Sequence, residues 1–160
     1  MRVGIGHDTH KLGSGGPLRV GGIDIPHDRH AIGHSDADVL LHAITDALLG
    51  AAALGDIGEL FPDTDPANRG RDSTEMLKLA AERTAAAGYR IANVDCIVFA
   101  QKPKLSAHKA AIARRVAEIL ALSPGQVCIK AKTAEGLGDI GAEAAIAAQC
   151  IALLIEHSDS

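Results

Sequence analysis

Residues 33–66 read GHSDADVLLHAITDALLGAAALGDIGELFPDTDP, and this stretch indicates how the chain folds. Its middle part predicts a helix over Asp36–Leu54, because apolar side chains recur there at helical spacing and form one stripe. Ser35 or Asp36 can cap the start of this helix, and Gly55 is a typical end. The members of the stripe are Val39, Leu40, Ala43, Ala47 and Leu48.

The segment that follows this helix, Asp56–Asp72, is rich in Gly, Pro, Asp and Asn. It is too polar to enter a core, so we expect a surface loop. A loop of this length usually carries function or moves.

Strand and helix patterns alternate along the rest of the chain. Gly21-Gly22 predicts a hairpin or a bulge, and the first strand is expected to run into an active-site loop. Periodicity alone does not assign the apolar tail Ala144–Ile155. The predicted strands are Arg2–Leu12, Leu18–Ile25, Tyr89–Gln101 and Val127–Lys132, and the other predicted helices are Ser73–Ala87 and Leu105–Leu120. Such alternation predicts a single domain over residues 1–160, of the α/β or α+β class, with helices packed on one sheet.

Composition argues against two classes of partner. The chain has 160 residues, is 47% hydrophobic and carries a net charge of -4. That charge gives no basic surface for a nucleic-acid backbone, and the three aromatic residues offer no platform for bases. No segment approaches the roughly 18 apolar residues of a membrane span. We therefore expect neither nucleic acid nor membrane as a partner, and a cytoplasmic location.

Three cysteines, Cys96, Cys128 and Cys150, lie in apolar runs without CxxC spacing. Their odd number does not suit a disulfide framework. We expect them to be buried free thiols that pack in the core.

Asp8, His10 and His42 are the candidate metal ligands. Residues two apart in an extended chain point to the same side, so Asp8 and His10 aim at one point while His7 and Thr9 face away. His42 would arrive from the predicted helix. Two imidazoles and one carboxylate leave a fourth position open, which is typical of catalytic zinc. Spacing alone leaves open the alternative that these are exposed histidines without a metal.

Two carboxylates, Asp38 and Asp46, lie one helical turn on either side of His42. Either can reach the imidazole and orient it. We expect Asp46 to do so.

Several turn-like segments could bind phosphate, since free backbone amides at a helix start suit phosphate oxygens. Lys104 and Lys132 could add positive charge, and Glu135 could hold a hard divalent ion. The alternative is ordinary capped turns and solvated charges. The segments are His34-Ser35, Asp56–Gly58, Phe61–Asp65 and Lys130–Glu135.

Four segments of the sequence resemble the 2-C-methyl-D-erythritol 2,4-cyclodiphosphate synthases of the non-mevalonate isoprenoid pathway. The resemblance covers nearly the entire chain, and its longest segment is highly specific. These segments are GHDTH at residues 6–10, residues 33–66 as quoted above, AQKPKL at residues 100–105 and KAKTAEGLG at residues 130–138.

The resemblance implies a lyase reaction. The substrate, 4-diphosphocytidyl-2-C-methyl-D-erythritol 2-phosphate, attacks its own β-phosphorus with its 2-phosphate, expels CMP and closes a cyclic diphosphate. Because the nucleophile belongs to the substrate, the protein has to fold it and stabilise charge. Asp8, His10 and His42 are implied to bind zinc, and His34 and Thr133 to stabilise the transition state. Glu135 is implied to help hold a second ion, magnesium or manganese.

The resemblance also implies two substrate-binding regions. The first, for the methylerythritol phosphate, comprises Asp8, His10, His34, Ser35, Asp56, Ile57, Gly58, Phe61, Pro62, Asp63, Thr64 and Asp65. The second, for the cytidine diphosphate, comprises Ala100, Gln101, Lys102, Pro103, Lys104, Leu105, Ser106, Lys132, Thr133, Ala134 and Glu135.

Members of the family look like homotrimers with active sites between neighbouring subunits. Each subunit is an α/β fold with a four-stranded sheet backed by helices. On that analogy the tail Ala144–Ile155 is a strand.

One stretch departs from the family pattern. After Gly138 the family commonly has an aromatic residue and, past a glycine, an arginine, whereas this chain has Asp139 and Ala142. Alanine removes a bidentate phosphate clamp and Asp139 repels phosphate. We therefore expect the core reaction to survive and an isoprenoid diphosphate on the trimer axis to bind weakly or not at all. Lys132, where a hydroxyl residue is more usual, partly restores positive charge.

Two other functions fit the same residues. One is a metal- or nucleotide-binding module of the same fold that has lost catalytic turnover. The departures from the family pattern at Asp139 and Ala142 are the evidence for this alternative. The other is a zinc hydrolase that uses metal-bound hydroxide, but no glutamate occupies an HExxH-type position.

Overall fold

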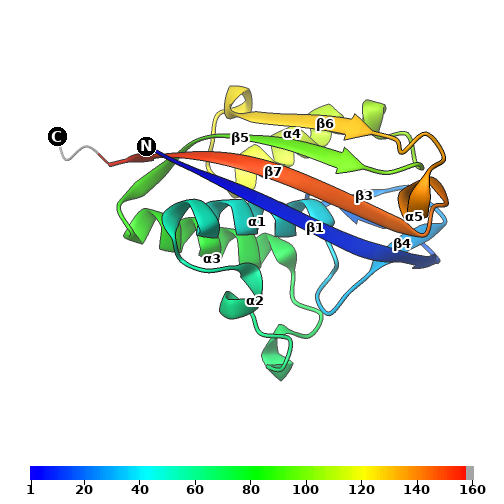
Figure 1. The fold of residues 1–160 in the computed structure, drawn as a ribbon, viewed down its shortest axis with the longest axis horizontal. Coiled ribbons are helices and arrows are strands. Elements are labelled where there is room, and N and C mark those ends of the chain that lie inside the picture. The colour runs from blue at the N-terminus through cyan, green and yellow to red at the C-terminus, as the bar shows by residue number, and fades with distance from the viewer. Residues whose placement is uncertain (158–160) are drawn as a thin grey trace.

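The fold is built around a long first strand. In the computed structural model, which describes residues 1–157, β1 spans Arg2–Ser14 and lies inside a mixed sheet of five strands (Figure 1). The strands lie in the order β4, β1, β7, β5, β6, and all neighbours are antiparallel except β5 and β6. Their bounds are Arg29–Ile32 for β4, Ala145–Glu156 for β7, Tyr89–Phe99 for β5 and Val127–Lys132 for β6.

The α/β fold class is confirmed, but the expected number of strands was wrong. Four strands were expected and five are present, because β1 continues past Leu12 and its last residues pair with β4 from Lys11↔Ile32 to Ser14↔Arg29. The expected change from strand to loop near Asp8 was also wrong, since Asp8 and His10 lie within β1 and pair with Ala148 and Ile146. The tail is a strand, as the resemblance implied.

A separate hairpin confirms the prediction at Gly21-Gly22. It joins β2 (Leu18–Val20) to β3 (Ile23–Ile25), and both turn glycines have positive φ, 65° and 75°. Two central residues with positive φ suit a tight two-residue hairpin turn.

Three helices cover one face of the sheet (Figure 1). α1 (Val39–Ala52) packs on β1 and β7, α3 (Ser73–Ala86) packs mainly on α1, and α4 (Lys109–Ile119) packs on β6. The short helices are α2 (Ile57–Leu60) and α5 (Gly138–Gly141), and 3₁₀ turns span Pro66–Asn68, Leu105–Ala107 and Pro124–Gln126. The predicted helix from Leu105 therefore starts as a 3₁₀ turn, and the predicted loop contains α2.

The start of α1 differs from the prediction. The N-cap is Asp38, not Ser35 or Asp36, and its carboxylate accepts a hydrogen bond from Leu41 N at 3.1 Å. The same carboxylate accepts hydrogen bonds from Gly21 N at 2.9 Å and Gly22 N at 2.7 Å. One buried side chain thus fastens the hairpin to the helix start. Ser35 and Asp36 make other contacts, which are described below.

The cysteines confirm the core prediction at two positions and contradict it at one. Cys96 and Cys150 are buried opposite each other on β5 and β7, whereas Cys128 is exposed. On the edge strand β6, Val127 and Ile129 face the helices and Cys128 faces the other side. An apolar run on an edge strand still alternates between two faces, and only one of them is covered.

The face of the sheet opposite the helices is apolar at one end. Val3, Ile5 and Ile151 expose 67%, 69% and 50% of their surface, and they lie on the neighbouring strands β1 and β7. Clustered exposed apolar side chains mark an interaction surface. Within residues 1–157, no helix has the length and apolar character needed to cross a membrane.

α1 and β1 approach each other unusually closely. A Cβ added at Gly6 would lie 1.9 Å from the carbonyl oxygen of Ala43 and 2.7 Å from Ala47 N, and one at Gly4 would lie 2.0 Å from the carbonyl oxygen of Ala47. Glycine on the strand and alanine on the helix are therefore what let the two backbones touch. This contact sets how far His42 on α1 lies from Asp8 and His10 on β1.

We predict that Gly6→Ala destabilises the protein by about 3 kcal/mol, because α1 must move away from β1 to admit the methyl group. Urea unfolding measures the change. Gly50→Ala is the matched control, since a Cβ there meets nothing within 4 Å. That variant should be neutral or more stable by about 0.5–1 kcal/mol, as expected for alanine in a helix. Equal stability of the Gly6→Ala variant and the wild type would contradict the close approach.

Candidate active site

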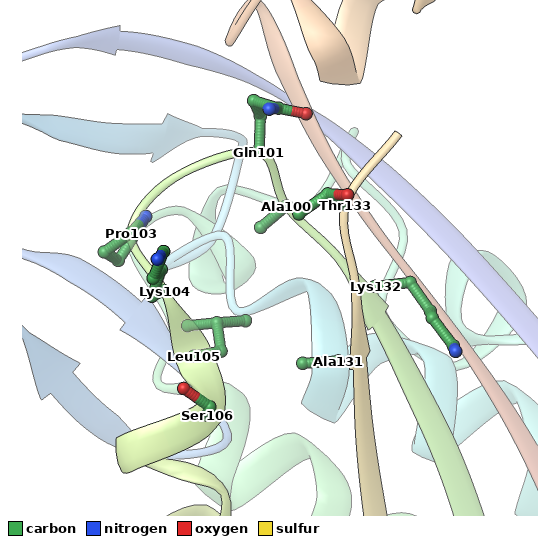
Figure 2. Close-up of a pocket in the computed structure, with 9 residues that line it drawn as sticks. All are labelled: Ala100, Gln101, Pro103, Lys104, Leu105, Ser106, Ala131, Lys132 and Thr133. Atoms are coloured by element: carbon green, nitrogen blue, oxygen red, sulfur yellow. The ribbon is translucent and has the colours of Figure 1, made fainter. Parts of the chain in front are cut away.

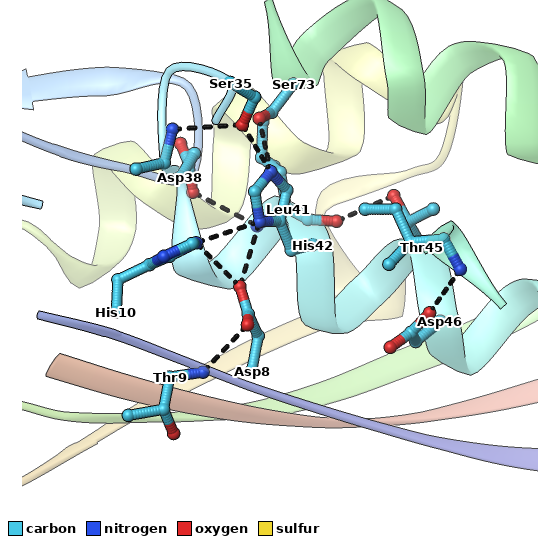
Figure 3. A network of polar contacts seen from close by, with 12 residues as sticks. Asp8, Thr9, His10, Ser35, Asp38, Leu41, His42, Thr45, Asp46 and Ser73 are labelled. Atoms are coloured by element: carbon cyan, nitrogen blue, oxygen red, sulfur yellow. Dashed lines mark hydrogen bonds and ion pairs between the residues drawn. The ribbon is translucent and has the colours of Figure 1, made fainter. Parts of the chain in front are cut away.

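The three predicted metal ligands meet at one point (Figure 3). β1 supplies Asp8 and His10 from the same side of the strand, and α1 supplies His42. The Oδ2 atom of Asp8 lies 2.9 Å from His42 Nδ1 and 3.0 Å from His10 Nε2, and these two nitrogens are 3.1 Å apart. His7 and Thr9 face away, with the Thr9 hydroxyl 3.1 Å from His7 Nε2.

This donor set suits a zinc-like ion. Tetrahedral ligands about 2.0–2.2 Å from zinc lie about 3.3 Å from one another, close to the separations found here. Two imidazole nitrogens and one carboxylate oxygen are donors that zinc accepts, and three protein ligands leave one position for substrate. Asp8, His10 and His42 thus form a group that can bind a metal ion.

The electrostatics of the group favour cation binding. Burial alone would raise the pKa of Asp8, but the hydrogen bonds and charges of His10 and His42 outweigh it and hold that pKa well below its usual value. Burial alone would lower the pKa of His10, but the hydrogen bond and charge of Asp8 outweigh it and raise that pKa above 6.5. The carboxylate is therefore charged at neutral pH, and a proton competes with a metal ion at His10.

The expected orienting role of Asp46 was wrong, and Asp38 does not take its place. The Asp46 carboxylate accepts a hydrogen bond from Ile57 N at 2.8 Å, while Asp38 caps α1. Both contacts follow from backbone amides that need acceptors at the starts of α2 and α1. The His42 Nε2 atom instead lies 3.0 Å from the Ser35 hydroxyl and 2.8 Å from the Ser73 hydroxyl.

A pocket opens beside the metal ligands and gathers many of the residues expected there. Its predicted lining residues are His10, His34, Ser35, His42, Ile57, Gly58, Phe61 and Asp63. Asn68 and Met76 also line it and were missed, because in the sequence they read as ordinary residues of a loop and a helix. Both lie within five residues of Ser73, the start of α3, and this closeness in sequence is the one feature that could have pointed to them.

Four residues of the predicted loop segments lie outside the lining of this pocket. Asp56 and Asp65 cap α2 and the Pro66–Asn68 turn, where their carboxylates accept from Glu59 N and Ala67 N. The carbonyl oxygen of Pro62 accepts a hydrogen bond from the Asn68 side chain. Thr64 is exposed. These residues shape the loop that borders the pocket.

A second pocket lies at the carboxyl ends of the parallel strands β5 and β6 (Figure 2). It is lined by the predicted residues Ala100, Gln101, Pro103, Lys104, Leu105, Ser106, Lys132 and Thr133, and by Ala131. Ala131 lies in the predicted phosphate-binding segment Lys130–Glu135, but the set of residues that the resemblance implied starts one residue later, at Lys132. Ligands commonly bind beyond the carboxyl ends of parallel strands.

Three other predicted residues border this pocket. The Lys102 ammonium pairs with the Glu143 carboxylate at 2.9 Å, which raises the pKa of Lys102. The Thr133 hydroxyl donates to Glu135 Oε1 at 2.9 Å, and Gly136 N donates to Gln101 Oε1 at 3.3 Å. Ala134 lies between Thr133 and Glu135. The hydrogen bonds from Thr133 and Gly136 hold Glu135 next to the pocket.

The two pockets share no lining residue in one chain. His34 lines the first and Thr133 lines the second. The residues that depart from the family pattern lie at α5, where Asp139 lines a separate hollow with Thr9 and Lys11, and Ala142 follows the helix as its C-cap.

Comparison with known proteins gives concordant matches. Residues 1–155 match the YgbB family. The chain is 59% identical over 143 residues to the 2-C-methyl-D-erythritol 2,4-cyclodiphosphate synthase of Gemmatimonas aurantiaca, a match that covers 89% of this chain and 86% of the relative.

Solved structures agree. The bifunctional IspDF from Campylobacter jejuni matches with a TM-score of 0.94 and 40% identity over 98% of this chain, which spans only 42% of that longer protein. A 2C-methyl-D-erythritol-2,4-cyclodiphosphate synthase in its CDP-bound form matches with a TM-score of 0.89 and 38% identity, over 96% of this chain and all of that one. Sequence and fold therefore lead to one conclusion: this chain belongs to the YgbB family.

Proposed function

We propose that the chain converts 4-diphosphocytidyl-2-C-methyl-D-erythritol 2-phosphate to 2-C-methyl-D-erythritol 2,4-cyclodiphosphate and CMP, in the bacterial cytosol. One observation carries the proposal. Asp8, His10 and His42 converge beside a pocket in a chain whose relatives are synthases of this name, one of them solved with CDP bound. The reaction needs charge stabilisation and a folded substrate rather than a nucleophile from the protein.

We assign the metal-side pocket to the methylerythritol phosphate. Asp8, His10 and His42 would hold zinc, which when bound polarises a phosphoryl oxygen of the substrate. His34 and Ser35 line the same pocket and can donate hydrogen bonds to phosphate oxygens.

We assign the pocket at the ends of β5 and β6 to the cytidine diphosphate. Lys104 and Lys132 supply positive charge for the phosphates, and the apolar side chain of Leu105 offers a surface for the base. The one hydrogen of the Thr133 hydroxyl points to Glu135 in this structure, and it would turn to a phosphoryl oxygen once Glu135 binds an ion and negative charge develops on the phosphate. Glu135, held by the Thr133 hydroxyl, would provide a carboxylate for a magnesium or manganese ion.

We further propose that the active site forms between subunits of a homotrimer. Cyclisation requires both ends of one substrate in one place, yet the two pockets of a single chain share no residue. The exposed apolar side chains Val3, Ile5 and Ile151 form a face that contact with another subunit would bury. Each complete site would then join the metal-side pocket of one subunit to the nucleotide-side pocket of its neighbour.

The first prediction from the proposed function concerns turnover. The purified protein with zinc and magnesium should release CMP and a cyclic diphosphate, detected by phosphorus NMR. His42→Ala should lose at least about 100-fold in rate, because a metal ligand matters more than the outer contacts, whose loss costs 10–100-fold. Glu82→Ala, on the exposed side of α3, should match the wild type.

The products decide among the alternatives. Release of CMP together with uncyclised methylerythritol phosphates would mean that the chain is a zinc hydrolase. Absence of turnover in a folded, metal-loaded protein would leave the silent binding module.

The second prediction tests the shared site. His42→Ala and Thr133→Ala proteins should each be nearly inactive, because each damages a different pocket. Mixing them after unfolding and refolding together should restore about a quarter of the wild-type activity, since random assembly pairs the two intact pockets in about a quarter of the sites. Each variant refolded alone is the control. Activity no higher than the average of the two variants would place the whole site within one subunit.

The third prediction concerns pH. Because the pKa of His10 is raised above 6.5, zinc affinity should fall as the pH drops from about 8 to about 6, approaching tenfold per unit below that pKa. The Asp8 carboxylate stays charged over this range because its pKa is lowered. Competition with a chromophoric chelator measures the affinity. His30→Gln should keep the same slope, since the His30 ring contacts Gly15 rather than the metal ligands. A flat profile would contradict the argument.

A further inference from the structure

The side of His42 that faces away from Asp8 and His10 contacts a chain of hydrogen-bonding groups (Figure 3). Its Nε2 atom lies 2.8 Å from the hydroxyl of Ser73, the first residue of α3. The Ser73 side chain is fully buried, so water does not compete for this contact. The imidazole therefore lies between the metal-binding point and the start of a different helix.

Ser73 is in turn held by Asp36. The Ser73 hydroxyl donates a short hydrogen bond to Asp36 Oδ1, and Ser73 N donates to Asp36 Oδ2 at 3.2 Å. Arg19 Nε donates to the same Oδ2 atom at 3.1 Å, and Asp38 N donates to Oδ1 at 3.3 Å. The Asp36 carboxylate thus accepts four hydrogen bonds, one of them from a guanidinium, which suits its ionised form.

These contacts fix the direction of the hydrogen bonds. A hydroxyl has one hydrogen, and Ser73 gives it to Asp36, so its oxygen can only accept from His42 Nε2. A neutral imidazole carries one hydrogen on its two nitrogens, and here Nε2 must carry it. Nδ1 is then left with a lone pair, and Nδ1 is the nitrogen that faces Asp8 and His10.

We propose that Asp36 and Ser73 are positioning residues of the metal site, which hold His42 in the tautomer and orientation that present Nδ1 to the ion. The inference rests on the metal site of the proposed function and deepens it. It gives these two residues the role that the sequence suggested for Asp46.

Ser35 has a different place, although its hydroxyl also lies 3.0 Å from His42 Nε2. Its oxygen accepts from Ala37 N at 3.1 Å, and the residue lines the metal-side pocket. The shorter contact to Ser73, backed by a carboxylate, dominates at Nε2. With Nε2–H given to Ser73, the Ser35 hydroxyl keeps its own hydrogen for an oxygen of a substrate in this pocket.

The chain of contacts also links distant segments. Arg19 lies on β2 and reaches Asp24 at 3.2 Å as well as Asp36, while its second terminal nitrogen is 3.8 Å from Asp72, the N-cap of α3. The hairpin, the start of α3 and the metal ligand on α1 are therefore held in one network. Such outer contacts commonly change metal affinity by 10–100-fold when they are removed.

The test is zinc affinity, measured by chelator competition with the whole protein. Ser73→Ala should lower the affinity 10–100-fold, and Asp36→Asn should do the same, because an amide can donate to Ser73 and reverse the hydrogen-bond direction. The double variant should lose no more than the larger single loss, since both residues act through one contact. Absorption of the cobalt-loaded proteins reports on ligand geometry, and both variants should shift its bands.

Thr74→Val is the matched control. Thr74 is the next residue of α3 and is also buried, but among residues 1–157 its hydroxyl makes no hydrogen bond to Asp36 or His42. It should bind zinc as the wild type does. Urea unfolding of all metal-free variants verifies that losses of affinity are not losses of fold.

The outcomes distinguish the hydrogen-bond relay from Asp36 through Ser73 to His42, called the relay below, from the proposed function. Wild-type affinity in both Ser73→Ala and Asp36→Asn would overturn the relay and leave the metal site intact. A loss in Thr74→Val equal to that in Ser73→Ala would also overturn it, because it would indicate a general effect on α3. No zinc binding by the wild-type chain would overturn the metal site and the relay together.

Discussion

The contact between α1 and β1 is the constraint on which the site depends. Gly4 and Gly6 on the strand face Ala43, Ala47 and Ala51 on the helix, and no side-chain methyl fits between the two backbones at these glycines. The metal donors lie on both sides of this contact. A strand and a helix that packed at ordinary separation would leave His42 too far from Asp8 to share an ion. These glycines and alanines, which carry no functional group, therefore determine the distances between the metal ligands.

A second layer of contacts holds α1 in register along that strand. Asp38 joins the helix start to the β2–β3 hairpin through three backbone amides, and burial raises its pKa although those amides oppose the shift. Asp36, two residues earlier, joins the same region to Arg19 and Ser73. Asp38 thus fixes the hairpin to the start of α1, and Asp36 fixes the hairpin to Ser73, which contacts His42. The chemistry proposed for the chain needs such rigidity, because it depends on placing two phosphate groups of one substrate within reach of each other.

The positions of the three metal ligands could be predicted from the sequence, because they follow from the local periodicity of strands and helices. Alternation along β1 placed Asp8 and His10 on one side, and the helical spacing of the apolar residues after Asp36 placed His42 on a helix that could approach them. Other features depend on partners distant in the sequence, and no local pattern marks them. The pairing of β4 with β1 made a fifth strand, and the edge position of β6 exposed Cys128. Asp46 had the right spacing to reach His42, yet the start of α2 placed an amide closer to it. Ser73 read as an ordinary helix start.

The most direct test of the account is the position of a bound metal ion. Crystals grown with zinc and measured at the zinc absorption edge should give an anomalous peak between Asp8 Oδ2, His10 Nε2 and His42 Nδ1, about 2.0–2.2 Å from each. The His42 Nε2 atom should remain within hydrogen-bonding distance of Ser73. A peak at another cluster of side chains, or His42 bound through Nε2, would contradict the claim that the close packing of α1 on β1 builds the metal site.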